Sequence, residues 1–377
     1  MQDPGAKRNR PAARLALAVL AVAAAGAQRV HAARSLPVDH DEDTYLRAGF
    51  RYAELMAAGR WGAIPYVAAN PEHPPLAKLA FGAALRATGA PEPDWRRVKV
   101  GRPVPREAWP AFAAGRFTCV ALGTTQVALL AAVHPMAALI VALDPYHAQY
   151  TSQAYLEALP GLLALLAVLA LAHARAGPAS ARALPTLAFA LAGAAAAGKH
   201  AFGLVAVLTL APFALAACRR RPLALGALAA AAVAAFVALD PALWPDPFGR
   251  AAEALRFHWQ YSQGGDVARA AFPWWQQVAW LLGAAPARSH PAVFPAGAAG
   301  AALLPLAASG GPIAWRRHPI FASWAAIAVA FLLAWPTKWP HYLLVATPAL
   351  AVCAADAITG AAAWIARRVR GQPAGVQ

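Results

Sequence analysis

Apolar runs of roughly 16 to 24 residues recur along the whole chain, separated by short charged or Pro-rich segments. A helical run of this length matches the hydrocarbon core of a bilayer. A membrane β-barrel would instead need alternating ten-residue segments, which the sequence lacks. Of the 377 residues, 60% are hydrophobic and 13% are charged. We therefore expect an all-α polytopic membrane protein, with one transmembrane domain over residues 1–377 and no separate soluble domain.

Short basic clusters predict which side of the membrane each connection faces. They lie at His173–Arg182, Arg219–Arg221, Arg316–Arg317 and Arg367–Arg370. The positive-inside rule puts all of them in the cytoplasm, so an even number of crossings separates each pair, and we expect about ten spans with both ends inside. The expected spans cover residues 15–27, 112–133, 135–143, 158–172, two short runs flanking Gly198–His200, 222–239, 291–311, 320–335 and 343–365.

The first apolar run, Leu15–Ala27, follows several basic residues and is either a signal anchor or a signal peptide cleaved near its small residues. In both cases the next segment is exported. We expect residues 30–110 to form a long extracytoplasmic loop with interfacial helices at Tyr45–Met56 and Leu76–Leu85. A second exported loop, residues 240–290, is rich in aromatic residues, which suit a membrane-interface belt, a sugar or an isoprenoid chain.

Four acids fall within five residues at Asp39, Asp41, Glu42 and Asp43. Asp39 and Asp43 are typical of helix-capping acids in a solvated loop. Asp41 and Glu42 precede Tyr45 at the mouth of a helix close to the bilayer, where a carboxylate can accept the proton of a hydroxyl nucleophile. Carboxylates also suit Mg²⁺ or Mn²⁺, so a divalent cation at Asp41 and Glu42 stays open.

Two further motifs carry polar side chains next to apolar runs. In the segment Glu72–Leu76, two prolines stiffen the chain, so His73 either contacts a polar substrate or a metal or simply stands at a rigid helix entry. Glu157 ends a Ser152–Glu157 segment that enters a span. A carboxylate at membrane depth is costly, so Glu157 is either functional or bonded structurally to Arg116.

Lys199 and Lys338 stand at expected outer turns. Either they extend their ammonium groups to the membrane surface or, together with Arg116, they bind a lipid-linked phosphate at head-group level. The topology puts six of these residues on the same face: Asp41, Glu42, His73, Glu157, Lys199 and Lys338. We expect them to line one cavity at the outer membrane surface.

The order of these motifs resembles the protein O-mannosyltransferase and aminoarabinose transferase group of glycosyltransferases. The motifs are DE at Asp41–Glu42 with Tyr45, HPPL at His73–Leu76, Arg116, SxAxxE at Ser152–Glu157, Lys199, and Lys338 with Tyr342. The resemblance implies a GT-C fold and a polyprenyl-phosphate-linked sugar donor. It also implies that Asp41 is the base that activates the acceptor, with Glu42 as its neighbour.

By the same resemblance, Glu157 is the second acid of the cavity, and Lys199 and Lys338 are partners of the donor phosphate. His73, Arg116 and Tyr342 complete the expected substrate-binding set. The sequence departs from the group in two respects. Glu157 stands where members often have Asp, and the chain ends shortly after its last apolar run, without the exported domain that many members carry.

These observations predict an inverting membrane glycosyltransferase, with its site on the extracytoplasmic side of the cell membrane. The expected partners are the polyprenyl-phosphate-linked donor, membrane lipid and an acceptor that is a protein, a lipid or a glycan; we expect no nucleic acid. One alternative is a transporter or flippase, whose functional charges usually lie near the bilayer midplane in broken helices. A second is a non-catalytic assembly subunit with the same fold.

Overall fold

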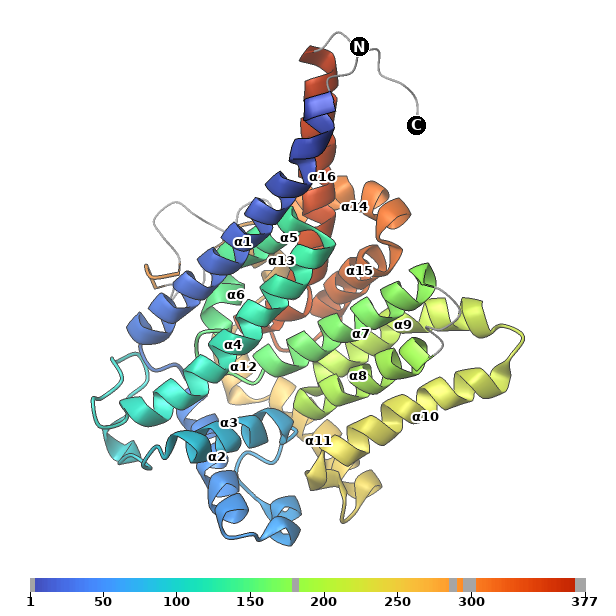
Figure 1. Ribbon diagram of the computed structural model, residues 1–377. Coiled ribbons are helices and arrows are strands. Elements are labelled where there is room, and N and C mark those ends of the chain that lie inside the picture. Colours follow the sequence, from blue (N-terminus) through green and yellow to red (C-terminus); the bar gives the residue numbers. More distant parts are fainter. Residues whose placement is uncertain (1–3, 178–182, 285–289, 294–302, 370–377) are drawn as a thin grey trace.

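The computed structural model describes residues 4–177, 183–284, 290–293 and 303–369. These residues form helices and connections without any strand (Figure 1), which confirms the predicted fold class. The α-helices are α1 (Pro4–Ser35), α2 (Glu42–Ala57), α3 (Leu76–Thr88), α4 (Trp109–Val133), α5 (Pro135–Leu143), α6 (Pro145–Tyr150), α7 (Ala158–Ala176), α8 (Leu184–Gly198), α9 (His200–Cys218), α10 (Pro222–Leu239), α11 (Pro247–Ser262), α12 (Gly265–Ala270), α13 (Gln276–Leu281), α14 (Leu303–Arg317), α15 (Pro319–Ala334) and α16 (Thr347–Val369). Short 3₁₀ helices are η1 (Trp61–Tyr66), η2 (Trp95–Arg97), η4 (Pro241–Leu243) and η5 (Pro340–Val345).

In the described part of the chain, six helices are long and apolar enough to cross a membrane. They are the Pro11–Ser35 part of α1, then α4, α7, α9, α10 and α16. The helices α8 and α15 are shorter but also apolar. The chain is therefore a multi-pass membrane protein, and these eight helices agree with eight of the expected spans.

One of the two remaining expected spans differs from the prediction, and the other is described only in part. Residues 135–143 form α5, whose nine residues extend only about 14 Å, roughly half of the hydrocarbon thickness. The prediction of a full crossing there is corrected, because the extended residues at His134 and Asp144 end the helix on both sides. The span expected at residues 291–311 lies partly outside the described residues, because 294–302 are not described, and residues 303–311 belong to α14.

Prolines and small residues explain where helices begin and how closely they pack. Pro135, Pro222 and Pro319 each stand in the first turn of a helix, where a missing backbone N–H costs nothing. Gly310 lets α14 approach α16, since a Cβ atom at this position would lie 1.9 Å from the carbonyl oxygen of Cys353. Such close backbone contacts are typical of helix pairs in membranes, where hydrophobicity alone does not drive association.

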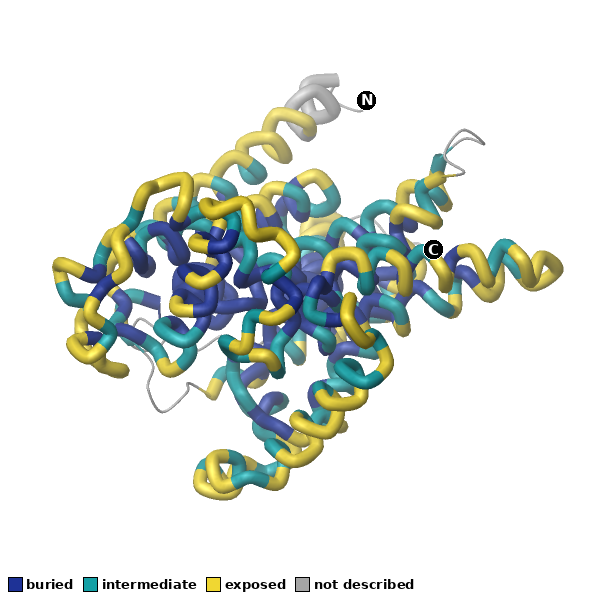
Figure 2. The backbone as a smooth tube through the Cα atoms, turned by 90° about the horizontal axis from the view of Figure 1, so that it is seen from below, coloured by how far each residue is buried: buried dark blue, intermediate teal, exposed yellow. Residues whose placement is uncertain are grey.

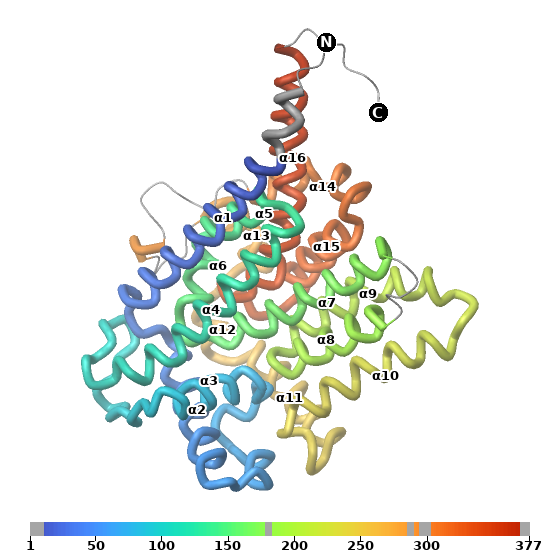
Figure 3. Tube along the Cα trace, viewed as in Figure 1, coloured from blue at the N-terminus to red at the C-terminus, as the bar shows by residue number. Residues whose placement is uncertain are grey.

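Different helices lie at the two ends of the molecule. The N-terminal part of α1 and the C-terminal part of α16 project at the same end, at the top of Figures 1 and 3, while α2, α3 and α11 lie at the opposite end. The helices expected at Tyr45–Met56 and Leu76–Leu85 are confirmed as α2 and α3. Arg250 of α11 donates from Nη1 to the carbonyl oxygen of Pro65 at 2.6 Å, so the two expected exported loops are in direct contact.

Buried residues concentrate in the middle of the molecule, and exposed residues follow its periphery (Figure 2). The most exposed large apolar side chains include Leu223 of α10 and Phe248 of α11, each with 90% of its surface exposed. Exposed apolar surface of this kind suits contact with lipid rather than with water. The buried centre, in contrast, contains several charged side chains, and these form the candidate site.

Candidate active site

Glu157 and Lys199 form an ion pair in the buried centre of the molecule. Glu157 immediately precedes α7, and Lys199 is the extended residue between α8 and α9, so two helix junctions bring the pair together. The Lys199 ammonium also lies 5.0 Å from the ring centroid of Tyr342, and Nε2 of His341 lies 3.6 Å from Oε1 of Glu157. Three segments that are far apart in sequence thus meet at one carboxylate.

The second oxygen of that carboxylate has no partner. The Glu157 side chain is fully buried, and its Oε2 accepts no hydrogen bond from the described residues. A buried acceptor without a donor costs free energy, so such an atom is usually paired with a ligand or an ordered water. The role of Glu157 in substrate binding stays a prediction, and the unpartnered Oε2 is consistent with it.

Asp41 lies close enough to this pair to be affected by both charges. It precedes α2, and its side chain makes no capping hydrogen bond. Burial raises the pKa of Asp41 from 3.8 to about 6, with the charge of Lys199 lowering it and that of Glu157 raising it further. A carboxylate with this pKa is mostly ionised at neutral pH but is a stronger base than an ordinary aspartate, as general-base catalysis requires.

The neighbouring Glu42 has a different environment. Both of its oxygens accept hydrogen bonds from Arg116, at 2.8 Å from Nε and 2.6 Å from Nη2. Oε1 also accepts from the backbone N–H of Ala154, and Oε2 accepts from that of Asp39. The side chain is fully buried. With four donors in place, this carboxylate holds the loop in position, and the geometry favours a positioning role over the catalytic role that the sequence suggested.

Every N–H group of the Arg116 guanidinium likewise donates a hydrogen bond. Besides Glu42, its guanidinium donates to the carbonyl oxygens of Ala33, Leu36 and Pro37 at 2.7–2.9 Å, which uses all five N–H groups. The predicted role of Arg116 in substrate binding does not fit this geometry, because no donor is left and the side chain is fully buried. The alternative bond between Arg116 and Glu157 is also absent, since each residue has a different partner.

His73 lies within a group of aromatic rings. Its ring centroid is 6.0 Å from that of Tyr45 and 5.7 Å from that of His258, which in turn is 6.0 Å from that of His200. Burial, and then the charge of Lys199, lower the pKa of His73 well below 6.5, so the ring is neutral. Its part in substrate binding stays a prediction.

Two further lysines hold backbone segments. Lys338 donates from Nζ to the carbonyl oxygens of Leu332 and Leu333, at 2.7 and 3.0 Å, and so caps the end of α15. Lys78 donates to the carbonyl oxygens of Asn70 and His73 and fixes the turn before α3. Of the two lysines predicted to bind phosphate, Lys199 pairs with Glu157, while Lys338 donates its hydrogen bonds to the end of the preceding helix α15.

A cavity of about 980 Å³ opens beside Asp41. Its lining comes from the segment before α2, from residues 149–155, from the aromatic segment 261–280 and from residues 339–341. His341 lies both in this lining and next to Glu157, so one side chain separates the cavity from the ion pair. The sequence analysis did not predict four residues near the site: His258, His341, Gln149 and Gln153. A single polar residue inside an aromatic or apolar segment has no characteristic spacing that would identify it.

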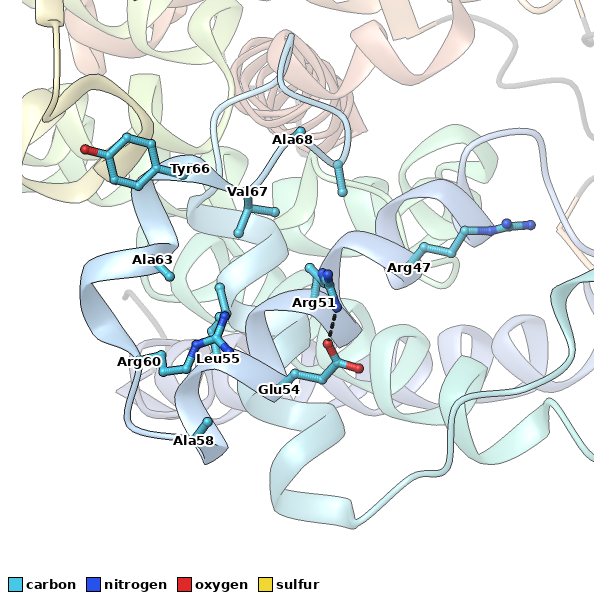
Figure 4. A pocket seen from close by; sticks show the side chains of 11 residues that line it. Arg47, Arg51, Glu54, Leu55, Ala58, Arg60, Ala63, Tyr66, Val67 and Ala68 are labelled. Carbon is cyan, nitrogen blue, oxygen red and sulfur yellow. Dashed lines mark hydrogen bonds and ion pairs between the residues drawn. The ribbon is translucent and has the colours of Figure 1, made fainter.

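A second cavity, of about 630 Å³, lies along α2 and η1 (Figure 4). It is basic, since Arg47, Arg51 and Arg60 line it, and Arg51 pairs with Glu54 at 2.6 Å. All three arginines are exposed, and the two cavities share no lining residue. Exposed arginines of this kind are usually solvated surface groups.

The expected divalent cation was assigned to Asp41 and Glu42. Glu42 fits a cation poorly, because each of its oxygens already accepts two hydrogen bonds from protein N–H groups. Within the described ranges, no group of three or more His, Cys, Asp or Glu side chains is arranged to hold a metal ion. A divalent cation at this pair stays a prediction that the saturation of Glu42 disfavours.

No family model matches the chain, and no curated protein matches it in sequence. Two crystal structures of ArnT from Cupriavidus metallidurans are similar in structure. The apo state has a TM-score of 0.56 and 16% identity, covering 93% of this chain and 61% of that one. The state bound to undecaprenyl phosphate has a TM-score of 0.50 and 17% identity, covering 90% of this chain and 60% of that one.

This chain thus spans about three-fifths of the length of the ArnT chains that it matches. At 16–17% identity the likeness concerns the fold. It extends over 90–93% of this chain. The protein accordingly has an ArnT-like GT-C fold, the architecture that its sequence motifs predicted.

Proposed function

We propose that this protein is a membrane glycosyltransferase that moves a sugar from a polyprenyl phosphate to a hydroxyl acceptor at the extracytoplasmic face. The observation that carries the proposal is the electrostatic group of Asp41, Glu157 and Lys199, of which Asp41 lines a large cavity. It combines a base of raised pKa, a buried cation and an unpartnered carboxylate oxygen. The undecaprenyl phosphate bound to a protein of the same fold supports the donor class.

In the proposed reaction the acceptor oxygen attacks the anomeric carbon of the donor sugar. Asp41 takes the proton of the acceptor hydroxyl as the new C–O bond forms. The bond from the anomeric carbon to the phosphate oxygen breaks, and polyprenyl phosphate leaves with the bonding electron pair. Lys199 stabilises the negative charge that develops on the phosphate, because a buried cation acts strongly where water is excluded. A single displacement of this kind inverts the anomeric carbon.

The positions of the basic clusters at the ends of the helices support an outward-facing site. Lys199 stands at the start of α9, and the basic cluster Arg219–Arg221 follows its other end, about 29 Å away along the helix axis. Arg316 and Arg317 likewise precede α15, whose opposite end is capped by Lys338. With the basic clusters in the cytoplasm, the site faces outward.

The test is Asp41→Asn in the full chain, expressed in a host strain from which the native gene has been deleted. Lipid mass spectrometry should show a polyprenyl-phosphate-linked sugar that accumulates to the level of the deletion, with protein expression and membrane insertion unchanged. Asp43→Asn, in the first turn of the same helix and paired with Arg47 at the surface, is the control and should restore wild-type lipids. Wild-type lipids in the Asp41→Asn strain would contradict the proposal and favour a transporter or an assembly subunit.

A further inference from the structure

Two glutamines line the cavity beside Asp41 and have unpartnered carbonyl oxygens. Gln149 is 7% exposed and Gln153 is 2% exposed, yet Oε1 of each accepts no hydrogen bond from the described residues. Gln153 Nε2 donates to the carbonyl oxygen of Pro37 at 3.2 Å, which anchors that side chain. Two buried acceptors without donors in one cavity indicate a ligand that brings O–H or N–H groups to them.

The charge of the cavity lining restricts the class of ligand. Asp39, Asp41 and Asp266 contribute three carboxylates, and Arg269 is the one Lys or Arg among the lining residues that the structure describes. Arg269 is already paired with Asp266. A phosphate or carboxylate bound against these lining residues would be repelled by the carboxylates and would find no free Lys or Arg among them, since Lys199 lies outside the lining. The cavity therefore fits an uncharged ligand.

Aromatic faces complete the lining. Phe272 packs edge-on against Trp280 and Trp339, with ring centroids 5.3 and 6.1 Å apart, and Tyr150 and Tyr155 line the same cavity. Flat aromatic surfaces next to hydrogen-bond acceptors suit pyranose rings, which present apolar C–H faces and peripheral hydroxyls. An extended peptide would require as many donors as acceptors from the protein, and this lining is rich in acceptors.

We infer that this cavity holds the acceptor and that the acceptor is an uncharged glycan, whose hydroxyls donate hydrogen bonds to Oε1 of Gln149 and Gln153. That the bound glycan is the acceptor, and not merely a ligand, rests on the proposed function, since Asp41 lies in the same lining. The glycan stacks on the Phe272 and Trp280 surface and directs one hydroxyl toward Asp41. A phosphate acceptor and a Ser or Thr peptide are the outcomes that the test must distinguish.

The experiment measures binding to the full chain in lipid nanodiscs by saturation-transfer NMR. The probes are a panel of neutral disaccharides (cellobiose, maltose, lactose and chitobiose), glucose 1-phosphate, and an acetylated, amidated Ala-Ala-Ser-Ala-Ala peptide. At least one disaccharide should bind, and the Gln149→Leu and Gln153→Leu double variant should weaken its binding at least tenfold. Thermal unfolding of each variant verifies that it is folded.

Gln277→Leu is the matched control. Oε1 of Gln277 is also buried and unpartnered, but this residue does not line the cavity, so its variant should bind the disaccharide like the wild type. The inference is overturned if no disaccharide binds, if the phosphate or the peptide binds more tightly, or if the double variant binds normally. Two measurements together separate the two proposals: disaccharide binding by the wild-type chain, and the lipid composition of the Asp41→Asn strain. If the wild-type chain binds a disaccharide as described and the Asp41→Asn strain has normal lipids, the cavity assignment is supported and the transferase proposal is contradicted.

Discussion

The two buried acid–base pairs of this protein differ in how completely they are satisfied. Glu42 and Arg116 share two hydrogen bonds, and every remaining N–H and carboxylate oxygen of the pair has a further partner. Glu157 and Lys199 share one ion pair, and one carboxylate oxygen has none. Burying either pair carries a desolvation cost. We infer from the difference that the first pair fixes the fold, and we predict that the second binds a ligand.

The largest expected effect on stability comes from breaking the Glu42–Arg116 pair. Arg116→Met leaves Glu42 as an uncompensated buried charge and removes the anchor of the segment that carries Asp41. We expect a loss of about 3–5 kcal/mol in the free energy of unfolding. Thermal unfolding followed by size-exclusion chromatography measures this loss. A variant with unchanged stability and reduced activity would instead assign Arg116 to the substrate.

Loss of the Glu157–Lys199 pair should have the opposite effect, with little change in stability and a large loss of sugar transfer. The double variant Glu157→Gln, Lys199→Met replaces two charges with neutral groups of similar size, an exchange that often leaves stability unchanged. Sugar transfer should fall by about 10²–10³, the usual cost of removing a stabilising group from a developing oxyanion. The comparison fails if this variant unfolds as readily as Arg116→Met while the rate of its folded fraction is normal.

The pH dependence of transfer should report Asp41. Because Asp41 acts as the base, only its ionised form is active, and its pKa is about 6. The rate should be constant above pH 7 and fall about tenfold for each unit below pH 6. Rate profiles of the purified protein between pH 4.5 and 8.5 measure this, and a profile without a break near pH 6 contradicts the assignment.

The raised pKa of Asp41 also has a consequence for stability. Between its ordinary value of 3.8 and about 6, the folded protein holds more of this proton than the unfolded chain. The stabilisation is therefore fully present below pH 3.8 and is lost as the pH rises through 6. Unfolding curves across this range should show a smaller change in Asp41→Asn than in the wild type.

The smallest expected effect concerns the basic cavity of Figure 4. Arg51→Gln removes an exposed pair with Glu54, whose two side chains are 66% and 53% exposed. Such pairs contribute at most about 1 kcal/mol, so stability and transfer should both stay close to wild type. A strong loss of transfer would show that this cavity, too, belongs to the site.

Much of the candidate site could be anticipated from the sequence, because its elements have local signals. The helices α2 and α3 follow from their apolar periodicity, and the turn at Lys199 follows from the interruption of an apolar run. Arg116 and Lys338 show where this reasoning stops. Both residues stand in motifs that suggest phosphate binding, but both donate to backbone carbonyl oxygens instead. The partners of Arg116 are distant in sequence, and those of Lys338 lie at the end of the preceding helix.

The sequence alone determined that the chain enters the membrane many times, and it predicted that the candidate site residues lie near one membrane surface. Helix length and the distribution of basic residues set both, and each is a property of short segments. Only the tertiary structure decided that Arg116 binds Glu42, that Lys199 binds Glu157, and that Gln149 and Gln153 face a cavity. Pairing and saturation depend on how helices pack against one another, because a buried charge takes whichever partner the packing brings within hydrogen-bonding distance.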